Sequence, residues 1–172
     1  LLGSFSKIVA PGLRLGWICA PREIMDRLVV AKQASDLHSS FFCQRVLHRY
    51  LADNDIDGHI AAITTAYKRQ KDAMLAAMET HFPPELEFTR PEGGMFIWVT
   101  LPDRLSAVEL FEHAIAEKVA FVPGTPFFVD GGGTHNMRLN FSNADEERIE
   151  EGIRRLGRII AVRLTHNDGR SL

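Results

Sequence analysis

The chain has 172 residues, of which 45% are hydrophobic and 24% are charged, and its formal net charge is −2. This composition is typical of a soluble globular protein with a real core and excludes a disordered chain. No block of basic residues and no apolar run of about 20 residues is present, so we expect contact with neither nucleic acid nor a membrane. The two cysteines, Cys19 and Cys43, have no metal-ligand spacing and indicate reduced thiols in a cytoplasmic protein.

The first twenty residues predict a pair of short strands. Residues 1–6 are expected to be extended, Pro-Gly at 11–12 predicts a turn, and residues 13–20 predict the second strand. Because successive side chains of a strand point to opposite faces, Ser4 and Ser6 are expected on the same side. The chain does not begin with Met, and its first residues look like the middle of a strand, so we expect it to be the C-terminal piece of a longer protein.

Helical periodicity predicts three helices in the middle of the chain. They cover residues 21–35, 40–53 and 56–81, and a pair of prolines ends the third. The positions expected to face inward are Ile24 and Leu28 in the first helix, Phe42, Val46 and Tyr50 in the second, and Ile56, Ile60, Ile63, Tyr67, Met74 and Met78 in the third.

From residue 83 onward, strands and helices alternate. The predicted strands are 86–90, 94–100, 119–123 and 136–141, with the first two forming an antiparallel pair. A capping box at Ser106 opens a helix to about residue 119, and the last helix covers 144–163. Residues 83–164 are therefore expected to form a small α/β domain.

One compact set of residues near the N-terminus could hold a phosphorylated aldehyde. Lysine forms an imine only when its amine is neutral, and a nearby cation such as Arg14 would lower the pKa of Lys7. The Arg14 guanidinium also matches phosphate oxygens, Ser4 and Ser6 supply hydroxyl donors, and Gly16 is expected to leave room beside Arg14. Spacing alone is weak, however, and favours an ordinary surface lysine and a strand-end charge.

A second candidate is Arg138, in a predicted strand whose other face is apolar. Its planar guanidinium could hold a substrate carboxylate through two hydrogen bonds, with Asn140 on the same face. The alternative is an edge-strand charge that faces solvent. The seven histidines have no metal-ligand spacing, so no metal site is expected, and no G-x-S-x-G elbow supports a serine hydrolase.

Five segments in order resemble the C-terminal part of the class I/II aminotransferases, which belong to the pyridoxal-phosphate-dependent fold-type I superfamily. They are GSFSKIVAPGLRLGW, HIAAITTAYKRQKDAM, RPEGGMFIWVTLP, VAFVPGTPFF and NMRLNFS. The resemblance is strongest to the branch that includes 2-aminoadipate and kynurenine aminotransferases and the MocR-like regulators, and it covers essentially the whole chain.

The resemblance implies an α/β fold, the C-terminal part of a PLP-transferase fold. Residues 1–55 would complete a large cofactor-binding domain, 56–82 an interdomain helix, 83–164 a small domain and 165–172 a tail. It also implies a transaminase that moves an amino group between an L-amino acid and a 2-oxo acid, with pyridoxal 5'-phosphate as cofactor, in a cytoplasmic homodimer.

The residue roles follow from the same resemblance. Lys7 would be the Schiff-base lysine and proton shuttle, and the cofactor phosphate would be bound by Ser4, Ser6 and Arg14. Arg138 would bind the substrate α-carboxylate. The family's other cofactor contacts lie upstream of these motifs and are absent from this chain, so we expect the 172 residues alone to be inactive.

Two alternatives share these motifs. The chain could be the effector domain of a MocR-like transcription regulator, or part of a related lyase or decarboxylase that also uses Lys7 and Arg14. The hairpin sequence PEGGMF favours the enzyme over the regulator. A basic winged helix-turn-helix upstream would instead favour the regulator.

Overall fold

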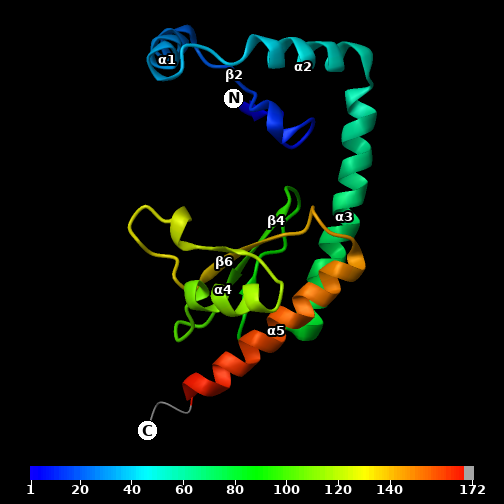
Figure 1. The fold of residues 1–172 in the computed structure, drawn as a ribbon, viewed down its shortest axis with the longest axis vertical. Helices are drawn as coiled ribbons and strands as arrows, with labels where there is room; N and C mark the ends of the chain where they lie inside the picture. Colours follow the sequence, from blue (N-terminus) through cyan, green and yellow to red (C-terminus); the bar gives the residue numbers. More distant parts are fainter. Residues whose placement is uncertain (169–172) are drawn as a thin grey trace. The chain divides into compact units, whose positions relative to one another are not determined.

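The structure, a computed structural model, describes residues 1–168 of the chain (Figure 1). The chain forms two compact units, which meet between Ala62 and Ile63. The boundary falls inside helix α3 (Ile56–His81). No helix among the described residues is long and apolar enough to cross a membrane.

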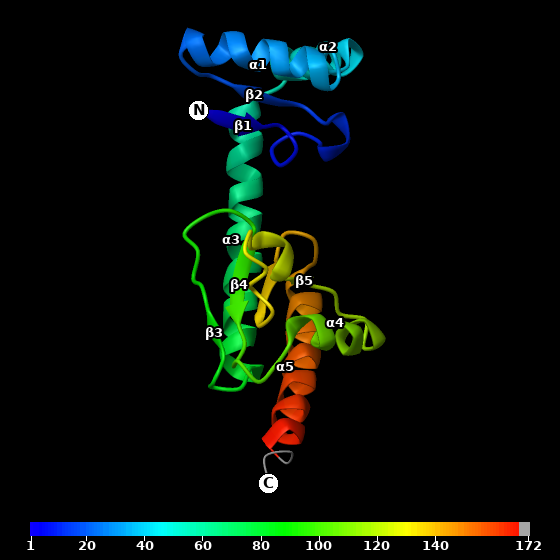
Figure 2. The ribbon, with the colours of Figure 1, turned by 90° about the vertical axis from the view of Figure 1, so that its left-hand side faces the viewer.

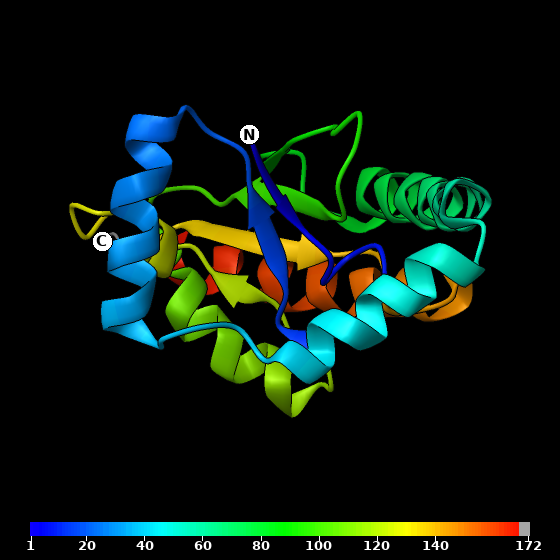
Figure 3. The same cartoon turned by 90° about the horizontal axis from the view of Figure 1, so that it is seen from above.

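The first unit begins with a two-stranded hairpin, visible as neighbouring arrows in Figure 3. Strand β1 (Leu2–Ser4) pairs antiparallel with β2 (Gly16–Ile18), and Gly3 lies opposite Trp17. The Trp17 indole occupies the space that a Cβ on Gly3 would need, and a Cβ on Gly16 would lie 2.8 Å from the Gly3 carbonyl oxygen. Both glycines are therefore required by the close approach of the two strands.

Both strands are shorter than the predicted ranges 1–6 and 13–20. The extended chain ends at Ser4 because the backbone N–H groups of Val9 and Ala10 both donate to the Phe5 carbonyl, at 2.9 and 3.1 Å, and form a turn. A 3-10 turn, η1 (Pro11–Leu13), then precedes β2. Neither feature was predicted, since strand periodicity over so few residues cannot show where the pairing stops.

The two predicted helices that follow are confirmed. They are α1 (Arg22–Ser35) and α2 (Phe41–Asp53), and the Ser40 hydroxyl caps α2 by accepting from the Cys43 N–H at 3.4 Å. The predicted inward faces are only partly right: Leu28 and Tyr50 are half-buried, but α1 buries no residue fully and α2 buries Leu47, which was not predicted. Ile24 is 51% and Phe42 75% exposed because no described element of the unit packs on those faces.

The second unit holds an antiparallel sheet in the order β3-β4-β6-β5 (Figure 2). The strands are β3 (Glu87–Phe88), β4 (Phe96–Thr100), β5 (Val122–Pro123) and β6 (Asn136–Asn140). The predicted antiparallel pairing of the first two strands is confirmed, although both are shorter than expected. Two helices complete the unit, α4 (Ala107–Ala116) and α5 (Glu146–Asp168).

One face of this sheet and the helices build the core. Ile97 and Val99 of β4 and Met137 and Leu139 of β6 are buried at alternate positions, as the periodicity of the last strand predicted. They pack with apolar residues of α3, α4 and α5, including Met78, Leu110, Leu156 and Ile160. The intervening residues of β4 and β6 therefore face the other side of the sheet.

The helix ends in the second unit are partly as predicted. The Ser106 hydroxyl accepts from the Glu109 N–H at 3.3 Å, which confirms the start of α4. The helix ends at Ala116, before the predicted residue 119, because Lys118 adopts the left-handed conformation (φ 63°). Helix α5 continues to Asp168, so the predicted tail at 165–172 starts as helix. Its remaining residues, 169–172, lie outside the described part.

We expect Gly157→Ala to destabilise the protein, because a Cβ there would collide with the backbone oxygen of His81 at the end of α3. Forcing that contact apart should lower the free energy of unfolding by about 1–3 kcal/mol. The matched control is Gly152→Ala in the same helix, where nothing lies within 4 Å of the added Cβ. That change should raise stability by about 1 kcal/mol through helix propensity. Urea unfolding of both variants measures the difference, and equal midpoints would contradict the close packing.

Candidate active site

The hairpin loop of the first unit carries most of the predicted site. The Phe5 N–H donates to the Leu15 carbonyl at 3.1 Å and closes a loop of residues 6–14. The backbone of this loop bonds mainly to itself, as in the Arg14 N–H to Pro11 carbonyl contact at 3.3 Å. The side chains that project from the loop are therefore available to a ligand.

Lys7 lies in the turn after β1, and its side chain is exposed. Its amine makes no hydrogen bond or ion pair with any of residues 1–168, although the chain has two more acidic than basic residues, 22 against 20. Lys32, by contrast, is held by Asp36 at 2.7 Å. The Lys7 amine is thus free to react or to bind.

Ser4 and Ser6 lie close together, but not because they alternate along one strand as predicted. Since β1 ends at Ser4, the two side chains do not share a strand face. Instead, the Ser4 hydroxyl accepts from the Ser6 N–H at 3.2 Å, in a local turn. This contact uses only an acceptor site of Ser4, so its O–H remains available as a donor.

Arg14 adopts the left-handed conformation, with φ 54° and ψ 37°. For a residue other than glycine this costs about 1–3 kcal/mol, and such residues are concentrated at functional sites. Its Nη1 donates to the Pro11 carbonyl at 3.2 Å, and no carboxylate among the described residues pairs with it. Gly16, which was expected to leave room beside Arg14, is also required by its contact with the Gly3 carbonyl oxygen.

Arg138 occupies the middle of β6 in the second unit. Its pairing partners are Trp98 on β4 and Val122 on β5, so strands flank it on both sides and the predicted alternative of an edge strand is excluded. The Arg138 Nε is buried and has no hydrogen-bond partner within residues 1–168. Other arginines of this unit pair with carboxylates, such as Arg158 with Glu117 at 2.8 Å, but none of the described acids pairs with Arg138.

Aromatic rings surround this guanidinium. Its central carbon lies 3.9 Å from the centroid of the Phe96 ring and 4.6 Å from that of Phe127. Sequence reasoning did not single out these rings, although Phe96 stands two residues before Trp98 and so shares its face. The Oδ1 of Asn140, on the same face of β6, accepts from the Ser142 N–H at 2.7 Å and hydroxyl at 2.8 Å, so its amide N–H groups are what it could offer a ligand.

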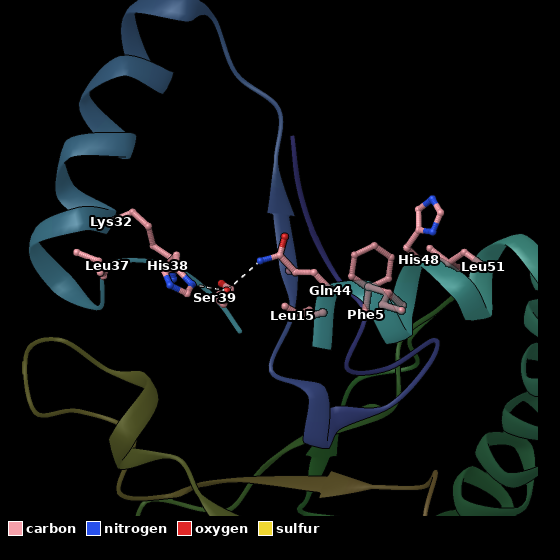
Figure 4. A pocket seen from close by; sticks show the side chains of 11 residues that line it. Phe5, Leu15, Lys32, Leu37, His38, Ser39, Gln44, His48 and Leu51 are labelled. Atoms are coloured by element: carbon pink, nitrogen blue, oxygen red, sulfur yellow. Dashed lines mark hydrogen bonds between the residues drawn. The ribbon is translucent and has the colours of Figure 1, made fainter. Parts of the chain in front are cut away.

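A pocket of about 510 Å³ lies within the first unit and was not predicted (Figure 4). It is lined by Phe5, Leu15, Gly16, Lys32, Leu37, His38, Ser39, Gln44, Leu47, His48 and Leu51. Several of its polar groups bond to one another: His38 Nδ1 and Gln44 Nε2 both contact the Ser39 carbonyl, at 2.9 Å. None of Ser4, Ser6, Lys7 and Arg14 lines it, so it is separate from the predicted cofactor contacts.

Among the described residues, no group of three or more His, Cys, Asp or Glu side chains could hold a metal ion. Three cations of the predicted site have no acidic partner among the described residues. Lys7 and Arg14 lie on one loop, and Arg138 lies on the sheet of the other unit. Such cations attract anions, and a guanidinium in particular fits carboxylate or phosphate oxygens.

Comparison with known proteins identifies similar sequences. A family model described as aminotransferase class I and II matches residues 1–156. The 2-aminoadipate transaminase of Thermus thermophilus is 45% identical over 92% of this chain and 40% of its own length. The aromatic-amino-acid aminotransferase 1 of Thermococcus litoralis is also 45% identical, over 92% of this chain and 38% of its own. The chain thus spans about two fifths of the length of these relatives.

A solved structure and a regulator are also similar. LysN from Thermus thermophilus, an alpha-aminoadipate aminotransferase complexed with N-(5'-phosphopyridoxyl)-L-leucine, matches with a TM-score of 0.90 and 44% identity, over 96% of this chain and 42% of that chain. An uncharacterized HTH-type transcriptional regulator from Bacillus subtilis, YdfD, is 30% identical over 92% of this chain and 33% of its own length.

We expect Arg14→Asn to separate stability from ligand binding. Asparagine tolerates the left-handed conformation, so the unfolding midpoint should stay the same or rise. Loss of the guanidinium should weaken binding of pyridoxal phosphate about tenfold or more, since a charge-assisted hydrogen bond contributes about 1.5–3 kcal/mol. Titration of the complete gene product with the cofactor measures this.

The matched control for that variant is Arg27→Asn, on the exposed helix α1, which should leave cofactor affinity unchanged. An Arg14→Asn protein that binds the cofactor as tightly as the parent would contradict the assignment of Arg14.

Proposed function

Because the chain belongs to the class I and II aminotransferase family, we propose that it is the C-terminal portion of a pyridoxal-phosphate-dependent aminotransferase. The predicted family and fold class are confirmed by the family match over residues 1–156 and by the likeness to the LysN structure at 44% identity. The observation that carries the proposal is that Lys7, Arg14 and Arg138, each within a segment that resembles a family motif, have no acidic partner among the described residues.

The residues of the hairpin loop fit the cofactor. Its phosphate needs a fixed cation and donors, and Arg14 and the Ser4 and Ser6 hydroxyls supply them. Its aldehyde needs a free amine, and the Lys7 amine has no partner among the described residues. Bound pyridoxal phosphate supplies the aldehyde and an electron sink for the substrate.

Lys7 has two tasks in this mechanism. Its amine would hold the cofactor aldehyde covalently when the cofactor is bound. Once free, the same amine would take the proton from the substrate Cα, which is general base catalysis by a positioned side chain. A lysine held in an ion pair would first have to break that pair before its amine could react. The Lys7 amine has no such partner among the described residues and can react directly.

Arg138 binds the substrate by its carboxylate. The guanidinium presents parallel donors, and a carboxylate would give its buried and unsatisfied Nε or its terminal nitrogens the partner they lack. This orients the amino acid by its α-carboxylate, whatever its side chain. This fits amino acids and 2-oxo acids as substrates, with the L configuration taken from the family.

The donor amino acid does not follow from the family. The two relatives at 45% identity are named for 2-aminoadipate and for aromatic amino acids. A panel of L-amino acids with 2-oxoglutarate, tested on the complete gene product, would identify the donor. Turnover with no amino acid of the panel would overturn the transaminase assignment.

Several further properties belong to the proposal. Residues 1–55 form the end of a large cofactor domain, 56–82 an interdomain helix and 83–164 the main part of a small domain, whose last helix continues to Asp168. The protein is a cytoplasmic homodimer in amino-acid metabolism. The free thiols of Cys19, which is exposed, and Cys43, which is half-buried, support a reducing compartment.

The second candidate is the effector domain of a transcription regulator. The similarity to the regulator YdfD, 30% identical over 92% of this chain, favours it. The higher identity to the two aminotransferases and the PEGGMF hairpin favour the enzyme. The sequence upstream of Leu1 in the gene distinguishes them, because a winged helix-turn-helix there would identify a regulator.

We expect Lys7→Arg to abolish covalent capture of the cofactor, since a guanidinium does not form the imine. In the parent complete gene product, treatment with pyridoxal phosphate and borohydride should label the peptide that contains Lys7, and mass spectrometry would detect the label. In Lys7→Arg the corresponding peptide should carry no label. Turnover should fall by a factor of about 100 to 10,000, the usual contribution of a catalytic acid or base.

Lys32→Arg is the control for this variant, because Lys32 is an exposed lysine already bound to Asp36. Labelling and turnover should both survive that change. Equal labelling of the parent protein and Lys7→Arg would show that Lys7 is not the attachment site.

A further inference from the structure

Two aromatic rings hold the guanidinium of Arg138 in place, and they come from different segments. Phe96 belongs to β4 and is two residues from Trp98, so both side chains lie on the face of the sheet opposite the core. Phe127 ends a 3-10 turn, η2 (Thr125–Phe127), in the connection between β5 and β6. The guanidinium carbon lies 3.9 Å from the first ring centroid and 4.6 Å from the second.

The base of the loop that carries Phe127 is fixed to β6. The Gly124 N–H donates to the Asn136 carbonyl at 2.7 Å, and the Asn136 N–H donates to the Gly133 carbonyl at 3.1 Å. Asn136 is buried, and its side-chain amide donates to the Thr100 hydroxyl at 3.1 Å. A Cβ on Gly124 would lie 2.6 Å from the Gly133 oxygen, so the two ends of the loop approach as closely as glycine allows.

Phe127 is also held from the side. Its ring meets the Trp98 ring edge to face, with the centroids 5.5 Å apart and an interplanar angle of 81°. Phe128 packs on the same Trp98, with the ring centroids 6.2 Å apart, and the cation–π contacts of Arg138 in the described chain do not include it. One loop therefore presents two neighbouring phenylalanines, of which one has a cation–π contact with the arginine.

An arginine fixed in this way is prepared for its ligand. A free arginine side chain loses rotamer entropy on binding, and prior ordering removes part of that cost. Contacts with aromatic rings do not use the N–H groups of the guanidinium, so these donors can still form hydrogen bonds in its plane. One of them, the Nε, is buried and has no partner within residues 1–168. The guanidinium is thus restrained by aromatic contacts, with no carboxylate of the described chain competing for it.

We propose that Phe127 is a positioning residue, which acts through Arg138 by holding its guanidinium in the orientation that receives the substrate carboxylate. This rests on the carboxylate-binding role proposed for Arg138. Phe127 itself touches neither cofactor nor carboxylate in this assignment. Its effect therefore appears in the affinity for carboxylates and vanishes when the guanidinium is absent.

The test measures binding of a carboxylic acid that cannot react, so that no turnover is needed. The probe is the carboxylic acid obtained by replacing the amino group of the best amino-acid donor with hydrogen; if no donor is found, the probe is adipate. Its binding to the complete gene product is measured by calorimetric titration. Phe127→Leu keeps an apolar side chain but removes the cation–π contact, and should weaken binding about fivefold. Phe127→Tyr should restore the affinity to within about twofold, since its ring face also attracts cations.

The matched control is Phe128→Leu, which changes the same loop and removes another ring contact with Trp98, but no cation–π contact with Arg138. It should leave the affinity unchanged, whereas a purely structural role of the loop would make the two leucine variants alike. In an Arg138→Gln background, Phe127→Leu should cause no further loss, because the group through which it acts is gone.

The outcomes separate this inference from the proposed function. If Arg138→Gln weakens binding and Phe127→Leu does not, the positioning role of Phe127 is overturned and the role of Arg138 stands. If Arg138→Gln binds the acid as tightly as the parent, both fail. If Phe127→Leu weakens binding equally with and without Arg138, Phe127 acts on the ligand by another route and the proposal is wrong.

Discussion

The pairing of β4 with β6 is the constraint on which the second unit depends. In its register Ile97 lies opposite Leu139 and Trp98 lies opposite Arg138. The first pair points to one face of the sheet and the second pair to the other. One face completes the core with the three helices, and the other carries the guanidinium and its aromatic neighbours. A shift of one residue would place Arg138 in the core and Met137 in the site, which is why fold and site depend on the same hydrogen bonds.

The first unit depends on a different constraint, the contact between two glycines. Because Gly3 and Gly16 let β1 and β2 approach closely, the chain between them must turn back within a short loop. That loop holds Lys7 exposed and forces Arg14 into a strained conformation. The helices that follow leave large apolar side chains exposed, such as Phe41 at 68% and Phe42 at 75%, so this unit offers surface that other protein could cover.

Periodicity and capping were enough to predict the helices and the strand of Arg138. Sequence could not show that β1 stops at Ser4, because the turn that ends it depends on backbone bonds to Phe5 rather than on residue type. Nor could helical stripes reveal that Ile24 faces solvent, since burial depends on what packs opposite. The cation–π contacts of Arg138 could not be predicted from the sequence either. Phe127 contacts Arg138 from a loop, and no local sequence pattern shows that the two side chains lie close together.

The connection between β5 and β6 has a rigid base and a free tip. Gly124, Gly133 and Asn136 fix the base, while Val129 is fully exposed and Gly131 adopts a positive φ of 81°. Insertions or deletions at such a tip need not disturb the residues anchored below it. Evolution, or an engineer, could therefore vary the length and chemistry of this tip while the guanidinium of Arg138 keeps its place.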